Sequence, residues 1–445
     1  MQPVVTELVQ AVMHAVNCDC LLKDTHTSSE QLENPASRPD CTLVAKGLRA
    51  EWTQVVSLWE FKLGTGKPET ETMYGQQVER CRAVLDSYHE RQLVVAVNVT
   101  MNTLEVMTAE RQPGNDMRLS TTGRQPFSIS QDSPGFQLLV QLLSTPNANL
   151  GYATPLMPAI NNLGQHRLKV QYLMKQGTAH QGSGSWVFGA KLETDRDAIL
   201  KLNKVSQEGD CLSRLKGEKH IIELLGTAQC DYNGATWHAI LVVPLVQRLN
   251  HRDDLRLFGQ VLFDIASGIG NAAKKDIAHR DVTPNNFGHW QGRGYLYDFS
   301  AAKDMSFGQW DRPRSAGTLS GITGTVLWAP LSVLEGGQHS VSSMLEGLFI
   351  SALSISCNGK LDSRHDMNPG RLRHCGHLRR GHLTTPTLSE LPRIESHLKP
   401  LIIGLHDLFY PLQDSKDLKS RAYSTQVTVD MVQGVCEHVC GALSP

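Results

Sequence analysis

The sequence has no uninterrupted apolar run of about 18 residues, the length from which a segment can span a bilayer. We therefore expect no membrane partner. The N-terminus lacks a basic region followed by an apolar core, so a secretory signal is not expected. Neither sign of charge is in excess. The formal net charge is −1, which argues neither for nor against a nucleic-acid partner.

Paired C-x-x-C motifs are also missing, although the chain has ten cysteines. Without that spacing a structural zinc site is not expected. Scattered thiols favour a reducing compartment. We expect an intracellular protein, cytoplasmic or nuclear, and a secreted effector that acts inside a host cell fits as well.

The chain has no internal repeat, and its 40% hydrophobic and 20% charged residues are typical of globular domains. Residues 111–134, rich in Pro, Gly, Ser and Thr, predict a loop, and residues 358–396 predict an exposed insert. Apolar periodicity predicts helices over 3–16, 74–88, 136–143 and 258–272, and strands over 41–45, 55–62, 92–100 and 103–108. We expect an α+β chain with a domain over 1–150, a linker over 151–167 and a domain over 168–445, divided into 168–247 and 248–445.

The segment from His279 to Asn286, followed by Asp298-Phe299-Ser300, is the most informative part of the chain. It has the form of the H-R-D-x-x-x-x-N catalytic loop and the D-F-G turn of protein kinases. In that chemistry Asp281 accepts the proton of the substrate hydroxyl, and Asn286 and Asp298 hold Mg²⁺ against the phosphates of ATP. Residues 287–298 predict a hairpin that brings Asn286 and Asp298 to one cation.

Upstream residues complete the pattern of a nucleotide site. Gly182 and Gly184 predict a glycine-rich loop over the phosphates, although their spacing departs from G-x-G-x-x-G. Lys201 ends an apolar strand and is the candidate phosphate-binding lysine. Its ion-pair partner is expected to be Glu208, which starts a helical pattern, with Glu218 as the alternative.

Flanking residues predict control and packing roles. Arg280 is a candidate to pair with a phosphorylated residue of the loop that follows Asp298, and an ordinary flexible Ser/Thr-rich loop is the alternative. His279 and Phe299 are expected to pack and not to react. The candidate phosphorylated residues are Ser315, Thr318, Ser320 and Thr323.

These residues resemble the fungal-type protein kinases, and the resemblance covers most of the chain. It implies a bilobal kinase-like domain, ATP and Mg²⁺ as cofactors, and a protein substrate. Three positions depart from the pattern: Thr283 replaces a lysine, Ser332 a glutamate and Met344 an aspartate. In the family, the glutamate and the aspartate normally brace the catalytic loop. Their replacement therefore affects the expected rigidity of that loop and the rate of catalysis. The matching segments are His279–Asn286, Gly324-Thr325, Val333-Leu334, Leu345–Phe349 and, more weakly, Arg38–Asp40, Trp52, Glu60–Lys62, Gly75-Gln76 and Leu150–Tyr152.

The N-terminal part carries a second candidate site. Asp40, Glu60 and Lys62 have the form P-D…E-x-K, which resembles the restriction-endonuclease-like nucleases. Two carboxylates on adjacent strands can hold a divalent cation, and the lysine can orient a water. Glu7, and Gln76 or Gln77, are candidate supporting residues. An edge strand with ordinary alternating charges would give the same residue pattern without a metal site. The N-terminal part also has no long run of basic residues that could bind the phosphates of a nucleic acid.

The sequence therefore predicts an ATP- and Mg²⁺-dependent protein kinase, with a kinase-like domain preceded by an α/β restriction-endonuclease-like domain. Crinkler-type effectors combine similar domains. Lys201, Arg280 and Asp281 are the catalytic candidates. The alternatives are a kinase-shaped scaffold that binds nucleotide and transfers slowly, and a protein that processes nucleic acid through its N-terminal site.

Overall fold

The computed structural model shows a mixed α+β chain with several sheets. Its residues group into two compact units, Met1–Asn161 with Lys169–Lys191, and Asn162–Leu168 with Leu192–Pro445. The residues that the structure describes are 2–25, 39–45, 52–61, 67–88, 90–113, 116–152, 157–175, 185–232, 234–305, 330, 333, 339–357, 394–413, 420–421, 424 and 426–441.

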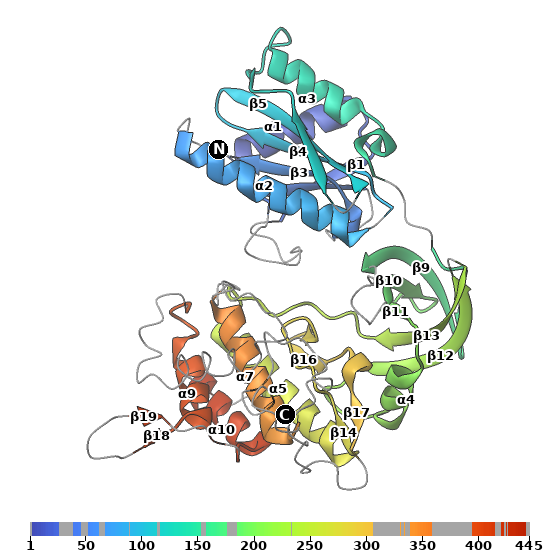
Figure 1. Ribbon diagram of the computed structural model, residues 1–445, viewed down its shortest axis with the longest axis vertical. Coiled ribbons are helices and arrows are strands. Elements are labelled where there is room, and N and C mark those ends of the chain that lie inside the picture. Colours follow the sequence, from blue (N-terminus) through green and yellow to red (C-terminus); the bar gives the residue numbers. More distant parts are fainter. Residues whose placement is uncertain are drawn as a thin grey trace. The chain divides into compact units, whose positions relative to one another are not determined.

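The first unit is built on a seven-stranded sheet with the order β1-β2-β3-β4-β5-β6, in which β7 also pairs with β5. Strands β3 and β4 are parallel, and the other neighbours are antiparallel. The strands are β1 (Cys20–Asp24), β2 (Cys41–Ala45), β3 (Val55–Phe61), β4 (Leu93–Val99), β5 (Thr103–Arg111), β6 (Met117–Thr121) and β7 (Gln125–Pro126) (Figure 1).

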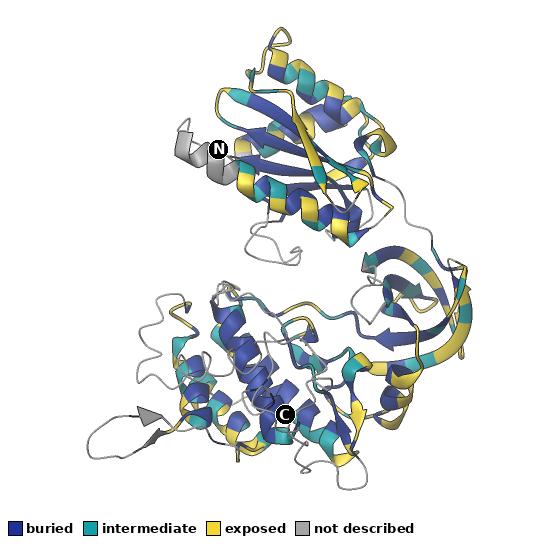
Figure 2. Cartoon of the chain, viewed as in Figure 1, coloured by how far each residue is buried: buried dark blue, intermediate teal, exposed yellow. Residues whose placement is uncertain are grey.

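Helices cover both faces of this sheet. Helices α1 (Gln2–Ala15) and α3 (Pro134–Ser144) bury their apolar residues in one cluster with Trp59 and Val97. Helix α2 (Lys67–Ser87), the crossover between the parallel strands, packs in a second cluster with Leu58 and Ala96. Since successive strand residues point to opposite faces, β3 and β4 are buried on both sides (Figure 2). Short 3-10 helices, η2 (Trp52–Gln54) and η4 (Asn147–Leu150), flank the sheet.

A six-stranded sheet with the order β12-β13-β11-β10-β9-β8 follows. Strand β12 is the long edge strand and has several exposed residues, whereas β11 and β13 are buried over most of their length (Figure 2). The strands are β8 (Asn162–Leu163), β9 (His166–Lys175), β10 (Trp186–Leu192), β11 (Asp197–Asn203), β12 (Glu223–Tyr232) and β13 (Ala235–Val243).

Helices dominate the chain after β13 and share a core with residues of β11 to β13. Helix α7 is buried on nearly all sides, as expected for a helix with few charged residues. The helices are α4 (Gln207–Arg214), α5 (Leu255–Lys274), α7 (Val341–Ser356), α9 (Lys399–Phe409) and α10 (Val429–Cys440), with η6 (Phe299–Ala301). Three short strand pairs are β14 (Ile277–Ala278) with β17 (Lys303–Asp304), β15 (Phe287–Trp290) with β16 (Arg293–Leu296), and β18 (Leu412–Gln413) with β19 (Ser420–Arg421).

The elements expected from periodicity are present, with shifted ends. Helix α2 begins at Lys67, earlier than residue 74, and α5 extends beyond 258–272 at both ends. The loop predicted over 111–134 is wrong in part, because it contains β6 and β7. Most of the insert predicted over 358–396 lies outside the described residues. The boundaries predicted at 150 and 168 stay a prediction, and the compact units assign 169–191 to the N-terminal part.

No described helix combines the length and the apolar character that crossing a membrane requires.

Candidate active site

Lys201 lies on the central strand β11 and joins two acidic side chains. Its ammonium nitrogen is 2.7 Å from Oε2 of Glu208 and 2.6 Å from Oδ1 of Asp298. Lys201 is 6% exposed and Glu208 is 3% exposed. The predicted Lys201–Glu208 ion pair is therefore present. The alternative, Glu218, pairs with Lys275 at 3.3 Å instead.

Burial and the charge of the neighbouring groups shift the pKa values of Lys201 and Glu208 in opposite directions. Burial alone would lower the pKa of Lys201, but the carboxylates of Asp298 and Glu208 outweigh it and raise that pKa. Burial raises the pKa of Glu208, and the ammonium of Lys201 and a 2.8 Å hydrogen bond from Asn203 Nδ2 favour its charged form. Lys201 thus stays a cation in a buried position, where it can attract phosphate oxygens.

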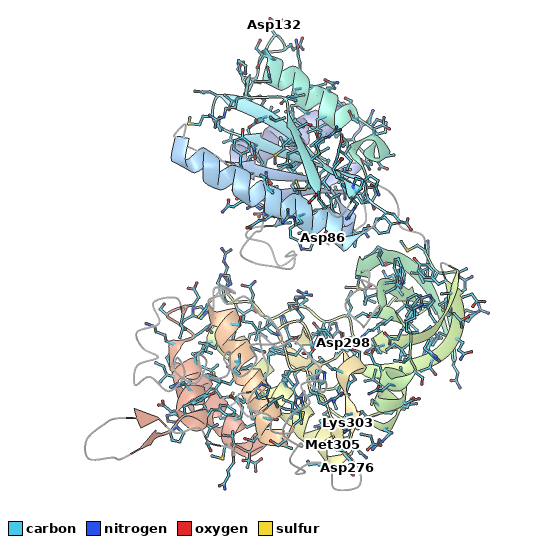
Figure 3. The ribbon with its side chains drawn as sticks, viewed as in Figure 1. Asp86, Asp132, Asp276, Asp298, Lys303 and Met305 are labelled. Atoms are coloured by element: carbon cyan, nitrogen blue, oxygen red, sulfur yellow. The ribbon has the colours of Figure 1, made fainter. Side chains whose placement is uncertain are left out.

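Asp298 sits at a turn that directs its carboxylate towards Lys201. Its φ of 60° and ψ of 66° lie in the left-handed region. The hydroxyl of Ser300, the residue in the usual glycine position, donates to Oδ1 of Asp298 at 2.6 Å. Figure 3 labels Asp298, which directly follows the β15–β16 hairpin and Tyr297. The left-handed residue of this turn is therefore Asp298, and Ser300 supports its carboxylate.

The predicted hairpin is confirmed, and it connects Asn286 to the residue before Asp298. Phe287 pairs with Leu296 in its first register position. One step further out, the Tyr297 amide donates to the Asn286 carbonyl at 2.9 Å. The hairpin therefore holds the backbones of Asn286 and Tyr297 together.

The amide of Asn286 is oriented by Asp281. Its Nδ2 donates to Oδ2 and to the main-chain oxygen of Asp281, each at 2.8 Å. Because the nitrogen is engaged in this way, the amide oxygen is the atom turned away from Asp281. The segment 281–286 thus forms one turn that presents a carboxylate and an amide oxygen.

His279 packs behind this turn in a neutral form. Its Nε2–H donates to the Tyr297 carbonyl at 2.9 Å, and its Nδ1 accepts from the Asp281 amide at 3.3 Å. Burial lowers its pKa, and the charges of Asp281, Asp298 and Lys201 are close enough to act on that pKa as well. Its ring meets Phe299 edge-on at 4.6 Å between centroids. The expected packing of His279 and Phe299 is confirmed.

Two main-chain carbonyls fix the flanks of the segment. Arg280, at φ 65°, donates from Nε to the Ala301 carbonyl at 2.8 Å. Ser351 on α7 donates to the Val282 carbonyl at 3.0 Å. Met344, on the same helix, is 1% exposed and packs in the core. Helix α7 therefore braces the segment through Ser351, a contact that the sequence pattern did not indicate.

The donor set suits a hard cation. Carboxylate and amide oxygens are the ligands that Mg²⁺ prefers, and such sites often use one or two protein ligands with phosphates and water. Asn286 and Asp298 supply two such side chains. Among the described residues, no group of three or more His, Cys, Asp and Glu side chains is arranged to hold a metal ion. A cation here would depend on the phosphates of a nucleotide for further ligands.

No family model matches the sequence, and no curated protein matches it either. The geometry of the site therefore carries the functional argument.

Some predicted positions lie outside the described residues. They are Gly182 and Gly184 of the glycine-rich loop, Lys62 of the N-terminal motif, the candidate phosphorylated residues Ser315, Thr318, Ser320 and Thr323, and Ser332.

The N-terminal candidates are engaged by their own fold. Oδ2 of Asp40 accepts the Phe61 amide at 2.7 Å, at the end of β3. Glu60, which is 2% exposed, is paired at 2.5 Å with Arg80 from α2. Glu7 is exposed on α1, and α1 covers the opposite face of the sheet from α2. Glu7 therefore does not lie with Glu60.

A row of polar contacts explains the position of Glu60. Glu60, Asn98 and Glu105 are register partners across β3, β4 and β5. Residues three apart on α2 meet them in turn. Arg80 pairs with Glu60, Gln77 donates to Asn98 at 2.9 Å, and Tyr74 donates to Glu105 at 2.7 and 2.5 Å. Residues three apart share one face of a helix. The row therefore registers α2 on the sheet, and Gln77 contributes to it through Asn98. A supporting role of Gln77 in a nuclease-like site stays a prediction.

Proposed function

We propose that the chain is an ATP- and Mg²⁺-dependent protein kinase that transfers the γ-phosphate to a protein hydroxyl, most simply that of Ser or Thr. One observation carries the proposal. The buried Lys201 is held between Glu208 and Asp298. The turn that joins Asp281 to Asn286 is bonded to the β15–β16 hairpin, which Asp298 follows. Phosphoryl transfer needs a fixed cation, metal-binding oxygens and a proton acceptor in one place.

The residues divide the work as follows. Lys201, kept charged and oriented by Glu208, would bind phosphate oxygens. The oxygens of Asn286 and Asp298 would hold Mg²⁺, which supplies charge neutralisation to the transferring phosphoryl group. Asp281 would accept the proton of the attacking hydroxyl. The Nδ2 of Asn286 steadies Asp281 at 2.8 Å, so the proton acceptor and the metal ligand hold each other in place.

The fold supports a finer assignment. The six-stranded sheet is accompanied by helix α4, and a mostly helical region with α5, α7, α9 and α10 follows it. This order of elements is compatible with a bilobal kinase-like domain. A mixed sheet with helices on both faces is compatible with a restriction-endonuclease-like α/β domain over 1–150. For that domain we propose a structural role for Glu60, because Arg80 neutralises its carboxylate.

A scaffold that binds nucleotide and transfers slowly is the second candidate, since the buried Met344 cannot replace an aspartate. The bond from Ser351 to Val282 favours transfer over this scaffold, because it gives the catalytic segment a brace from the same helix.

Labelled ATP tests the proposal. The purified chain is incubated with γ-labelled ATP and Mg²⁺, alone and with generic protein acceptors, beside the Asp298→Ala variant. We expect label in protein with the wild type and little with the variant. A thermal shift with Mg-ATP but no transferred label would favour the scaffold. Neither shift nor label would refute both.

A further inference from the structure

Glu208 lies in the first turn of a very short helix. Helix α4 has 8 residues, and its N-cap, Ser206, makes no capping hydrogen bond with its side chain. Isolated helices of this length are unstable in water, so tertiary contacts must hold α4 in place. Its buried Cys211 and Leu212 pack into the core.

Both ends of α4 are bound to the segment that follows Asp298. At the N-terminal end, the side-chain Nε2 of Gln207 donates to the Ala302 carbonyl. At the C-terminal end, Arg214 is paired with Asp304 at 2.5 Å and donates to the Lys275 carbonyl at 2.6 Å. One guanidinium thus joins α4, β17 and the C-cap of α5.

That segment is in turn fixed beside the residues that lead into Asp281. Strand β17 pairs with β14, with Asp304 opposite Ile277. The Met305 amide donates to the Asp276 carbonyl at 2.7 Å. In Figure 3 the labels of Asp298, Lys303, Met305 and Asp276 stand one below another. The acidic partners of Lys201 are therefore carried by elements that contact each other independently of Lys201.

We propose that Arg214 is a positioning residue for the Lys201 site. By joining α4 to β17 and to the end of α5, it keeps Glu208 at the distance at which it can share Lys201 with Asp298. This role deepens the proposed kinase function, on which its value for catalysis rests. The pair is partly exposed, with side-chain exposures of 41% for Arg214 and 51% for Asp304, so it acts as an adjustable contact and not as a core element.

Chemical labelling of Lys201 tests the role without depending on phosphoryl transfer. The full chain is treated briefly with an amine-acylating reagent, and the modification rate of each lysine is measured by peptide mass spectrometry. Lys201 is buried and paired, so it should react slowly in the wild type. For Arg214→Ala and for Asp304→Ala we expect its rate to rise about two- to fivefold, the factor that corresponds to one partly exposed ion pair.

Two further variants separate positioning from general loosening. Glu218→Gln removes the neighbouring side-chain pair with Lys275 but leaves the Lys275 carbonyl, the atom that Arg214 contacts, in place. It should leave the Lys201 rate unchanged. The exchange Arg214→Asp with Asp304→Arg restores the ion pair but not the hydrogen bond to the Lys275 carbonyl. It should therefore return the rate part of the way towards the wild-type value. Circular dichroism melting of each variant checks that the fold is retained.

The outcomes are distinct. If Arg214→Ala and Glu218→Gln label Lys201 equally, Arg214 has no positioning role. If the exchange labels Lys201 as fast as Arg214→Ala, the ion pair with Asp304 has no part in that role. If labelling follows the expected order but the wild type transfers no phosphate, the positioning role stands and the kinase proposal fails. With an active wild type, kcat/KM for Mg-ATP should fall by a similar factor in Arg214→Ala.

Discussion

Replacing Glu208 by glutamine isolates the charge that the site depends on. The two side chains of the Lys201–Glu208 pair are 8% and 4% exposed, so removing the carboxylate leaves Lys201 with Asp298 as its remaining ionic partner. Breaking a buried pair outright costs about 3–5 kcal/mol. Because Asp298 remains and the glutamine oxygen can still accept from Asn203, we expect a smaller loss, about 1–3 kcal/mol of unfolding free energy.

The matched control is Glu218→Gln in the same unit. Its pair with Lys275 spans 3.3 Å, and those side chains are 26% and 49% exposed. An exposed pair of this kind contributes less than about 1 kcal/mol. The two variants make the same chemical change, so the difference between them reports burial and not the loss of a carboxylate in general.

The assay is urea denaturation monitored by tryptophan fluorescence. The dependence of the unfolding free energy on urea concentration is compared between variants before the midpoints are interpreted. We expect a clearly lower midpoint for Glu208→Gln and a nearly unchanged one for Glu218→Gln. Equal midpoints would show that Lys201 and Glu208 do not form a buried pair in solution.

Two further predictions concern stability. Gln54→Ala removes a buried hydrogen bond of 2.7 Å to the Leu173 carbonyl, so we expect the unfolding free energy from urea denaturation to fall by about 1–3 kcal/mol. The control Gln92→Ala, at an exposed position, should change it little. Equal losses would contradict the reasoning. Burial lowers the pKa of His279 and of His289, so both are neutral when folded, and the unfolded chain binds more protons as pH falls below about 6.5. Stability should therefore fall between about pH 7 and pH 5, and a flat or rising urea midpoint over that range would refute the assignment.

Local patterns predicted the parts of the site that lie close in sequence. The hairpin over 287–298 could be predicted because turn residues separate two short apolar runs. The Lys201–Glu208 pair could be predicted because a strand ends shortly before a helical pattern begins. In both cases the structure is formed by near neighbours along the chain.

Contacts between distant elements could not be predicted in the same way. Ser351 reaches Val282 only because α7 packs beside that segment, and nothing in its own sequence marks it. Strand β6 is mostly exposed at the sheet edge, so no apolar alternation reveals it. Arg80 had a weak signal, since Tyr74, Gln77 and Arg80 are polar residues three apart on a helix whose apolar residues Cys81, Val84 and Leu85 pack against the sheet.

Phosphoryl transfer by Asp281→Asn tests the central claim most directly, with Asp231→Asn, an exposed change on the β12–β13 hairpin, as the control. Transfer is measured at saturating Mg-ATP, after nucleotide binding has been checked by thermal shift. If Asp281 accepts the hydroxyl proton, its variant should bind nucleotide but transfer roughly 10²–10⁴ times more slowly, while the control keeps the wild-type rate. An Asp281→Asn chain that transfers phosphate as fast as the wild type would contradict the assignment.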